Sequence, residues 1–191
     1  MTRVALVSLC SLVFALAACE RKPAPVEPAL HAAVPASAQA TTSLLAPGAP
    51  LPDLEGVSQT GERVNLKSLQ GKPVVVYFYP KDDTPGCTVE AQEIRDAWQE
   101  LSGSGAVVVG VSVDDAASHR AFAEKHALPF LLVADQDLRW AQAFGVPLKN
   151  GRTSRVSFVF GRDGKLSKVF PAVKPQGHAR ELGDALHALG A

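Results

Sequence analysis

Cysteine is scarce in this chain of 191 residues, which holds Cys10, Cys19 and Cys87 and no others. Cys10 falls within an N-terminal apolar run and Cys19 directly follows that run, so Cys87 is the one thiol of the expected folded domain. A disulfide framework within that domain is therefore excluded. This is unusual for an exported chain, because thiols tend to be oxidised outside the cytoplasm.

An excess of charge of either sign is also lacking. The 19 Lys and Arg residues balance the 19 Asp and Glu residues, so nothing electrostatic points to nucleic acid. Metal ligands are sparse, since methionine occurs once, at Met1, and the histidines show no metal-ligand spacing. We therefore expect no metal and no cofactor. Four histidines of the domain are predicted to lie on its surface: His119, His126, His178 and His187.

The N-terminal segment lacks an apolar run long enough to span a membrane. Arg3 gives it a short basic start, and residues 4–18 form an apolar run that small residues close. A spanning helix needs about 20 residues, so this shorter run predicts a cleaved export signal over residues 1–18.

The end of this run, Leu16-Ala17-Ala18-Cys19, resembles the lipobox of bacterial lipoproteins. The resemblance implies that Cys19 becomes the lipidated first residue of an exported chain, which more than one acyl chain would hold stably at a membrane. The protein would then belong to the bacterial cell envelope and face the periplasm. The residue after Cys19 is Glu20, whereas an inner-membrane retention signal usually has Asp at this position. The absence of Asp favours the outer membrane. The alternative is an ordinary signal peptide that is cut beside Ala18.

Two further regions follow the export signal. Residues 19–45 are rich in Ala and Pro and cannot bury enough apolar surface to offset the entropy of ordering, so they are predicted to form a tether. Residues 46–191 are numerous enough for one compact domain with its own core.

Apolar runs and turn signals predict the order of elements in this domain. A β-hairpin is expected around Thr60-Gly61, and the apolar run at 74–79 predicts a central strand that is buried on both faces. Further strands are expected at 106–113 and 129–134, helices at 87–103, 116–126, 137–144 and 177–189, and a second hairpin from 155–160 and 165–170. This order predicts an α/β fold with a mixed central sheet flanked by helices.

Cys87 directly follows the expected central strand and begins a helix. This arrangement resembles the thioredoxin fold, here with an N-terminal β-hairpin extension. Unpaired backbone N–H groups and the positive end of the helix dipole favour a thiolate at a helix start, and the thiolate is the nucleophilic form of cysteine. Taken alone, however, a free cysteine is more often an inert buried residue.

Pro80, Thr84 and Cys87 have the spacing P-x-x-x-T-x-x-C, which matches the active-site motif of peroxiredoxins. The fuller stretch at 77–88 resembles the Q-type branch, also called bacterioferritin comigratory proteins. Further matches follow in order along residues 46–191: Ile94-Arg95-Asp96, Phe144-Gly145-Val146, Arg155-Val-Ser-Phe-Val and Asp163-Gly164-Lys165. The resemblance implies a thiol-dependent peroxidase that reduces hydrogen peroxide and organic hydroperoxides through a cysteine sulfenic acid.

The resemblance also implies a role for each matched residue. Cys87 attacks the terminal oxygen of the hydroperoxide as a thiolate, and the positive charge of Arg155 stabilises that form. Thr84 donates its hydroxyl to the thiolate or orients the peroxide oxygens. Pro80, which has no N–H, forms a wall of the pocket, and Gly86 lets the backbone come close to the substrate.

Many Q-type members carry a resolving cysteine five residues after the first, where this chain has Gln92. No other cysteine follows, so the resemblance implies a one-cysteine enzyme whose sulfenic acid an external thiol reduces. A thioredoxin-like exported protein, a glutaredoxin with glutathione and a small thiol all remain open as the donor. Q-type relatives are often monomers, so a monomer is expected.

Two other classes of protein remain as alternatives. A thiol–disulfide oxidoreductase on the same fold would need C-x-x-C, and Thr84 occupies the first of these cysteine positions. A copper-delivery or thiol-binding module of the cell envelope would need a second cysteine, or clustered His and Met ligands, near Cys87.

Overall fold

The computed structural model describes residues 43–190. The export signal expected at 1–18, the lipid attachment expected at Cys19 and most of the tether expected at 19–45 lie outside these residues. Leu44 and Leu45 pack against one core of the domain, and the amide of Leu45 donates to the carbonyl of Phe144 at 2.9 Å. The packed chain therefore begins no later than Leu44, ahead of the expected boundary at residue 46.

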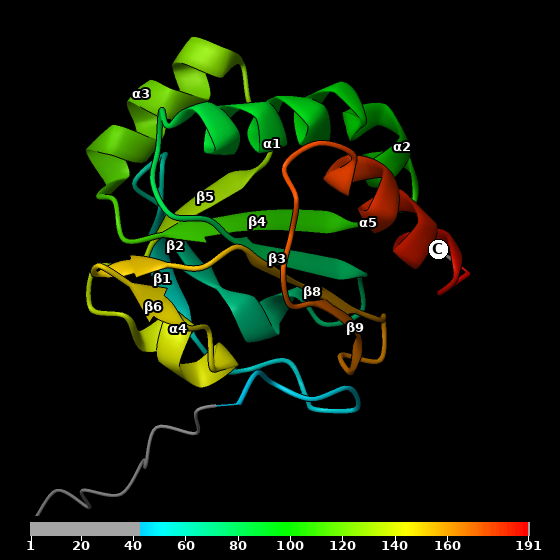
Figure 1. The fold of residues 1–191 in the computed structure, drawn as a ribbon. Coiled ribbons are helices and arrows are strands. Elements are labelled where there is room, and N and C mark those ends of the chain that lie inside the picture. The colour runs from blue at the N-terminus through cyan, green and yellow to red at the C-terminus, as the bar shows by residue number, and fades with distance from the viewer. Residues whose placement is uncertain (1–42, 191) are drawn as a thin grey trace, which may run out of the picture. The chain divides into compact units, whose positions relative to one another are not determined.

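A mixed seven-stranded sheet forms the centre of the domain, in the order β2-β1-β5-β4-β3-β8-β9 (Figure 1). Its parallel middle consists of β3 (Val74–Phe78), β4 (Val107–Ser112) and β5 (Leu131–Ala134). The apolar sequence of β3 predicts burial on both faces, and every residue of the strand is buried. The predicted α/β fold with a mixed central sheet is confirmed.

Antiparallel strands extend this sheet on both sides. β1 (Glu55–Ser58) and β2 (Arg63–Asn65) form the N-terminal hairpin that the sequence predicts, and β1 also pairs with β5. On the other side, β8 (Val156–Phe160) pairs with β3, and β9 (Leu166–Phe170) pairs with β8. The 3-10 helix η1 (Leu66–Leu69) follows the N-terminal hairpin.

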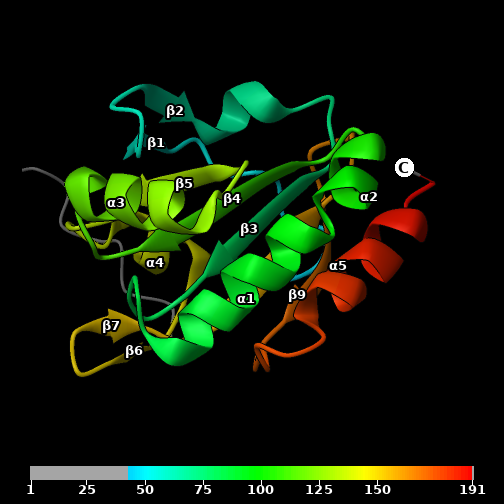
Figure 2. The same ribbon diagram turned by 90° about the horizontal axis from the view of Figure 1, so that it is seen from above.

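Helices cover the two faces of the sheet unequally. Four of them, α1 (Pro85–Asp96), α2 (Trp98–Gly103), α3 (Ala116–His126) and α5 (His178–His187), lie on one face, and α4 (Arg139–Phe144) lies on the other (Figures 1 and 2). No helix within residues 43–190 is long and apolar enough to cross a membrane.

Each face of the sheet has its own hydrophobic core. The core beneath α1 contains Tyr77 and Tyr79 of the β3 segment together with Cys87, and the opposite core contains Phe78 and Trp140. Neighbouring residues of β3 thus point to opposite faces, as the two-residue period of a strand requires. The candidate nucleophile belongs to the core on the helix-rich face.

The helix expected at 87–103 begins earlier and is divided. α1 starts at Pro85, whose ring favours the helical φ and whose missing N–H would have no partner in the first turn anyway. The chain breaks at Ala97, with φ −85° and ψ 5°, and α2 begins at Trp98. Cys87 is therefore the third residue of its helix rather than the first.

The sequence patterns above do not predict a short hairpin of β6 (Leu148–Lys149) and β7 (Arg152–Thr153). Asn150 and Gly151 connect the two strands with φ values of 53° and 71°, and a two-residue type I′ turn needs positive φ at both positions. The Asn-Gly pair was the available signal. Strands this short carry no hydrophobic period that would support it.

The prediction of surface histidines is wrong for His119 and His178, whose side chains are fully buried. Nδ1 of His119 lies 2.9 Å from Oδ2 of Asp82, and a serine hydroxyl lies 2.8 Å from Nε2 of His178. Such partners make burial of a polar group possible, and the sequence does not reveal them. Of the other two, His126 is half-buried and His187 is exposed.

Candidate active site

Cys87 lies where the chain leaves the buried middle of the sheet. β3 ends at Phe78, Pro80 has no N–H to continue the strand pairing, and α1 begins at Pro85. We call residues 79–84 the site loop. Cys87 follows in the first turn of α1, and 2% of its surface is exposed.

Two side chains contact the sulfur of Cys87. Oγ1 of Thr84 lies 2.8 Å from it and Nη2 of Arg155 lies 3.1 Å from it. Thr84 stands at the N-cap position of α1 but makes no capping bond with its side chain. Its hydroxyl instead lies between the sulfur and the carbonyl oxygen of Lys81, 3.0 Å away. The Thr84 side chain therefore contacts the sulfur and the site loop and does not cap the helix.

Strand pairing brings Arg155 to the site from a distant part of the sequence. Arg155 directly precedes β8, and the antiparallel pairing of β8 with β3 places Val156 opposite Phe78. Arg155 is therefore held at the end of β3 from which the site loop departs. The structure thus brings Arg155, Thr84 and Cys87 together, the grouping that the resemblance to peroxiredoxins implies.

Glu90 also belongs to this site, although the motif does not indicate it. Its Oε2 accepts a hydrogen bond from Nη1 of Arg155 at 2.5 Å, and its side chain is fully buried. Burial raises the pKa of Glu90 to about 7, against the lowering effect of Arg155. The sequence signal was its position three residues after Cys87, which places both side chains on one face of α1.

Arg155 bridges these two groups with its two terminal nitrogens. Its side chain is half-buried, and burial alone would lower the pKa of Arg155, but Glu90 and Cys87 together raise it. The guanidinium therefore stays charged beside the sulfur.

Gly86 leaves space for Arg155 beside the nucleophile. A Cβ at this position would lie 2.9 Å from Nη2 of Arg155, so the guanidinium fills the space that a side chain would need. The sequence predicts that Gly86 admits the substrate to the backbone. That expectation stays a prediction, and the structure shows in addition that the missing side chain leaves room for Arg155 at the sulfur.

A buried carboxylate fixes the site loop. The hydroxyl of Tyr79 donates to Oδ1 of Asp82 at 2.7 Å, while Oδ2 accepts from the hydroxyl of Ser118 at 2.7 Å and lies 2.9 Å from Nδ1 of His119. Burial opposes the charged form, but these hydrogen bonds outweigh it and lower the pKa of Asp82. The loop that carries Thr84 is thus tied to α3.

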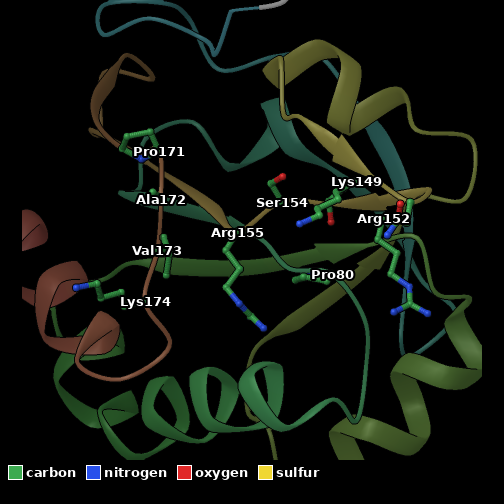
Figure 3. A pocket seen from close by; sticks show the side chains of 11 residues that line it. Pro80, Lys149, Arg152, Ser154, Arg155, Pro171, Ala172, Val173 and Lys174 are labelled. Carbon is green, nitrogen blue, oxygen red and sulfur yellow. The ribbon is translucent and has the colours of Figure 1, made fainter.

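A cavity of about 680 Å³ adjoins the guanidinium of Arg155 (Figure 3). The predicted wall residue Pro80 lines it. The other lining residues come from the β6–β7 hairpin, the segment before β8 and the segment after β9: Lys149, Asn150, Arg152, Thr153, Ser154, Pro171, Ala172, Val173 and Lys174.

Gln92 occupies the position in α1 at which many Q-type members carry a resolving cysteine. Its Nε2 lies 3.3 Å from Nδ1 of His126. Cys87 is the one free cysteine within residues 43–190, and in the same residues no three His, Cys, Asp or Glu side chains form a metal-binding group. This part of the chain therefore offers Cys87 neither a disulfide partner nor a metal.

Comparison with known proteins assigns the chain to a family. A model of the AhpC/TSA family matches residues 47–169. Peroxiredoxin Bcp of Bacillus subtilis is 42% identical over 141 residues, which cover 70% of this chain and 90% of the relative. The chain belongs to the peroxiredoxin Q/Bcp family.

Solved structures of peroxiredoxins share its fold. A peroxiredoxin Q of Xylella fastidiosa matches with a TM-score of 0.74 and 28% identity, over 78% of this chain and 99% of that one. The bacterioferritin comigratory protein of Xanthomonas campestris, studied for alkyl peroxide reduction, matches with a TM-score of 0.71 and 32% identity, over 76% and 100%. This peroxiredoxin therefore has the thioredoxin-like fold and is a thiol-dependent peroxidase.

Proposed function

We propose that Cys87 is the nucleophile that reduces the peroxide. The observation that carries the proposal is the pair of donors on its sulfur, Oγ1 of Thr84 at 2.8 Å and Nη2 of Arg155 at 3.1 Å. A hydroxyl donor and a cation at these distances stabilise a thiolate relative to a thiol. Cys87 is therefore prepared for attack before the peroxide arrives.

The reaction transfers one oxygen atom to the sulfur. The thiolate attacks the terminal oxygen of a hydroperoxide, the S–O bond forms as the O–O bond breaks, and the leaving alkoxide takes a proton to become an alcohol. Cys87 is oxidised to a sulfenic acid. The charge moves from sulfur to oxygen, and donors already in place beside the sulfur stabilise it there without reorganising. Thr84 and Arg155 supply these donors, and Glu90 holds the guanidinium in position.

The sulfenic acid requires a thiol from another molecule. Gln92 stands where a resolving cysteine would be, so an external thiol forms a mixed disulfide with Cys87 and a second thiol releases it. This cycle is supported over dithiol exchange because Thr84 fills the first position of a C-x-x-C motif and contacts the sulfur as a hydroxyl.

We also propose that the protein is exported and anchored through a lipid on Cys19, so that it faces the periplasm from the outer membrane. The sequence Leu16-Ala17-Ala18-Cys19 and the following Glu20 support this location. We also propose that the protein is a monomer, because Q-type relatives are often monomers.

The test of the catalytic proposal is a titration with hydrogen peroxide followed by intact mass. The mature chain with Cys19→Ser should gain one oxygen atom per molecule and consume peroxide when a thiol is supplied. The same chain with Cys87→Ser added should do neither. Peroxide consumption that survives Cys87→Ser would refute the assignment.

Cell fractionation tests the location separately. Cys19→Ser should move the protein from the membrane fraction to the soluble fraction of the envelope without loss of peroxidase activity. A processed Cys19→Ser protein that stays in the membrane fraction would contradict the lipid anchor.

A further inference from the structure

The cavity beside Arg155 carries positive charge that hydrogen peroxide, a small neutral molecule, does not require. Lys149, Arg152 and Lys174 line it, and no Asp or Glu side chain of the described residues does. Within residues 43–190 none of these three basic side chains forms an ion pair. Arg155, in contrast, has a countercharge in Glu90. The cavity therefore offers cationic groups to a ligand.

The rest of the cavity wall is largely apolar. Pro80, Pro171, Ala172 and Val173 contribute to it, and the volume is about 680 Å³. Small-molecule sites commonly measure roughly 300–1,000 Å³, whereas a water molecule takes about 30 Å³ in the liquid. Hydrogen peroxide would fill a small part of this space. The size and lining fit an organic molecule with an apolar part and an anionic group.

The basic residues flank the guanidinium that contacts Cys87. Figure 3 shows Lys149 and Arg152 on one side of Arg155 and Lys174 on the other. Lys174 also lines a neighbouring hollow whose lining includes an acidic residue, Glu181. Lys149 and Arg152, from the β6–β7 hairpin, are therefore expected to contribute most of the attraction for an anion.

Access to the sulfur favours a small partner over a protein. Cys87 is 2% exposed, and Arg155 both lines the cavity and lies 3.1 Å from the sulfur. A protein thiol would have to reach this buried atom at the surface of a second folded molecule. A small thiol can instead enter the cavity, and although Cys87 does not itself line it, Arg155 both lines the cavity and contacts the sulfur.

We propose that this cavity binds a low-molecular-weight thiol bearing one or more carboxylates, and that this thiol reduces the sulfenic acid of Cys87. The inference rests on the proposed function, because it requires that Cys87 form a sulfenic acid. An organic anion could also enter as the hydroperoxide of an acid, so the experiment must separate the thiol step from the peroxide step.

The proposed step is a condensation. The thiolate of the small molecule attacks the sulfur of the sulfenic acid, an S–S bond forms, the S–O bond breaks, and hydroxide leaves and is protonated to water. A second molecule of the same thiol then attacks the mixed disulfide at the small molecule's sulfur. Cys87 is released reduced, and the two small molecules leave as their disulfide.

The test compares three thiols of similar size and different charge. The mature Cys19→Ser chain is oxidised with one equivalent of hydrogen peroxide, and loss of the sulfenic acid is followed by quenched-flow intact mass. The thiols are 3-mercaptopropionate, 2-mercaptoethanol and cysteamine, with rates expressed per thiolate. We expect the anionic thiol to react roughly tenfold faster than the neutral one at low salt, and cysteamine to be slowest, because clustered charge raises the local ligand concentration. Added salt should reduce the difference.

Charge-removing variants locate the effect. The double variant Lys149→Gln/Arg152→Gln should abolish the preference for 3-mercaptopropionate and leave the rate with 2-mercaptoethanol unchanged. Lys72→Gln, at an exposed lysine before β3 and outside the cavity lining, is the matched control and should keep the preference. Equal rates for the three thiols, or a preference that the double variant retains, would overturn the proposal.

Oxidation rates distinguish whether the anion that the cavity binds is the thiol or the hydroperoxide of an acid. If the double variant slows oxidation of Cys87 by a fatty-acid hydroperoxide but not by tert-butyl hydroperoxide, and thiol rates are unchanged, the cavity serves the peroxide and the proposal is wrong. If no peroxide adds oxygen to Cys87, the proposed function itself fails. That result differs from a sulfenic acid that forms normally and shows no preference among thiols.

Discussion

The guanidinium of Arg155 occupies the space beside the sulfur of Cys87 that a side chain at Gly86 would need. A Cβ at residue 86 would lie 2.9 Å from Nη2 of Arg155, closer than a Cβ atom normally approaches a heavy atom. The same nitrogen lies 3.1 Å from the sulfur. The contact between guanidinium and sulfur therefore depends on the absence of a side chain one residue before the nucleophile.

Gly86→Ala should consequently slow the oxidation of Cys87 without unfolding the protein. The added methyl group meets the end of a flexible side chain, so Arg155 can move aside, but it then leaves the sulfur. Displacement of a catalytic group by about 1 Å can cost on the order of 10²-fold in rate, and we expect a loss of roughly 10–100-fold. Stopped-flow measurement of the second-order rate constant with hydrogen peroxide tests this.

Gly103→Ala is the matched control for that variant. Gly103 ends α2, and a Cβ there would meet no atom within 4 Å. Its rate constant should equal that of the unmodified protein. If Gly86→Ala also reacts at the full rate, the contact of Arg155 with the sulfur is not needed for the peroxide step.

Thr84→Val should lower the same rate constant by removing the hydroxyl at nearly constant shape. The hydroxyl lies 2.8 Å from the sulfur, and loss of one such donor from an active site typically costs about 10²–10³-fold. Helix stability should change little, because Thr84 makes no side-chain capping bond. Thr84→Ser keeps the hydroxyl and should retain most of the rate.

Thr88→Val provides the matched control on the same helix. Thr88 is half-buried one residue after the nucleophile, and its change should leave the rate intact. Should Thr84→Ser lose as much activity as Thr84→Val, the methyl group rather than the hydroxyl would be the essential part of Thr84.

The sequence predicts the local part of this site better than the distant part. Thr84 and Cys87 are three residues apart, so their proximity follows from one turn of chain. Arg155 reaches the sulfur through the pairing of β8 with β3, which a sequence pattern does not specify, and the resemblance to a known family was needed to identify it. Glu90 was missed because a glutamate on a helix ordinarily lies in solvent, and its burial depends on Arg155.

The same distinction holds for the fold. The buried strand at 74–79 and the helix α3 follow from their own composition, and the structure has them within one residue of the predicted bounds. Burial of His119 follows instead from its contacts with Asp82 and Tyr79, which come from a separate segment of the chain. The divided helix at Ala97 likewise has no signal in the sequence, because alanine favours the helix interior. The secondary-structure preference of a segment was thus sufficient to predict its element wherever the tertiary contacts favoured the same structure.

The raised pKa of Glu90 predicts a pH-dependent difference in stability between Glu90→Gln and the unmodified protein. Burial raises this pKa from 4.5 to about 7, so between those values the folded protein holds a proton that the unfolded chain has lost. Glu90 therefore lowers stability as pH rises through this window. Gln does not titrate, so Glu90→Gln lacks this loss of stability. As pH rises from 4.5 to 7, the free energy of unfolding of the variant should therefore increase by on the order of 3 kcal/mol relative to that of the unmodified protein.

Urea unfolding at several pH values measures this difference. Other groups also make stability depend on pH, since burial raises the pKa of Asp135 to about 6 and lowers the pKa of His178. They affect both proteins alike, so the difference isolates Glu90. Glu124→Gln, at an exposed position of α3, should show a difference that does not vary with pH. A Glu90→Gln difference that is equally flat would mean that Glu90 is ionised throughout.

Asp82→Asn should destabilise the protein and slow the peroxide step together. Tyr79, Ser118 and His119 converge on its two buried oxygens, and Asn replaces one acceptor oxygen with a donor nitrogen. A buried group left without its partner costs about 1–3 kcal/mol, which urea unfolding resolves.

The rate should fall as well, because Asp82 fixes the loop that brings Thr84 to the sulfur. Ser118→Ala removes one of the three hydrogen bonds and leaves the carboxylate, so it should lower stability by roughly 1 kcal/mol and keep most of the rate. Asp184→Asn, at an exposed position of α5, should change neither quantity. If Asp82→Asn loses stability but retains the full rate of Cys87 oxidation, the buried carboxylate supports the fold alone and Thr84 is positioned by other contacts.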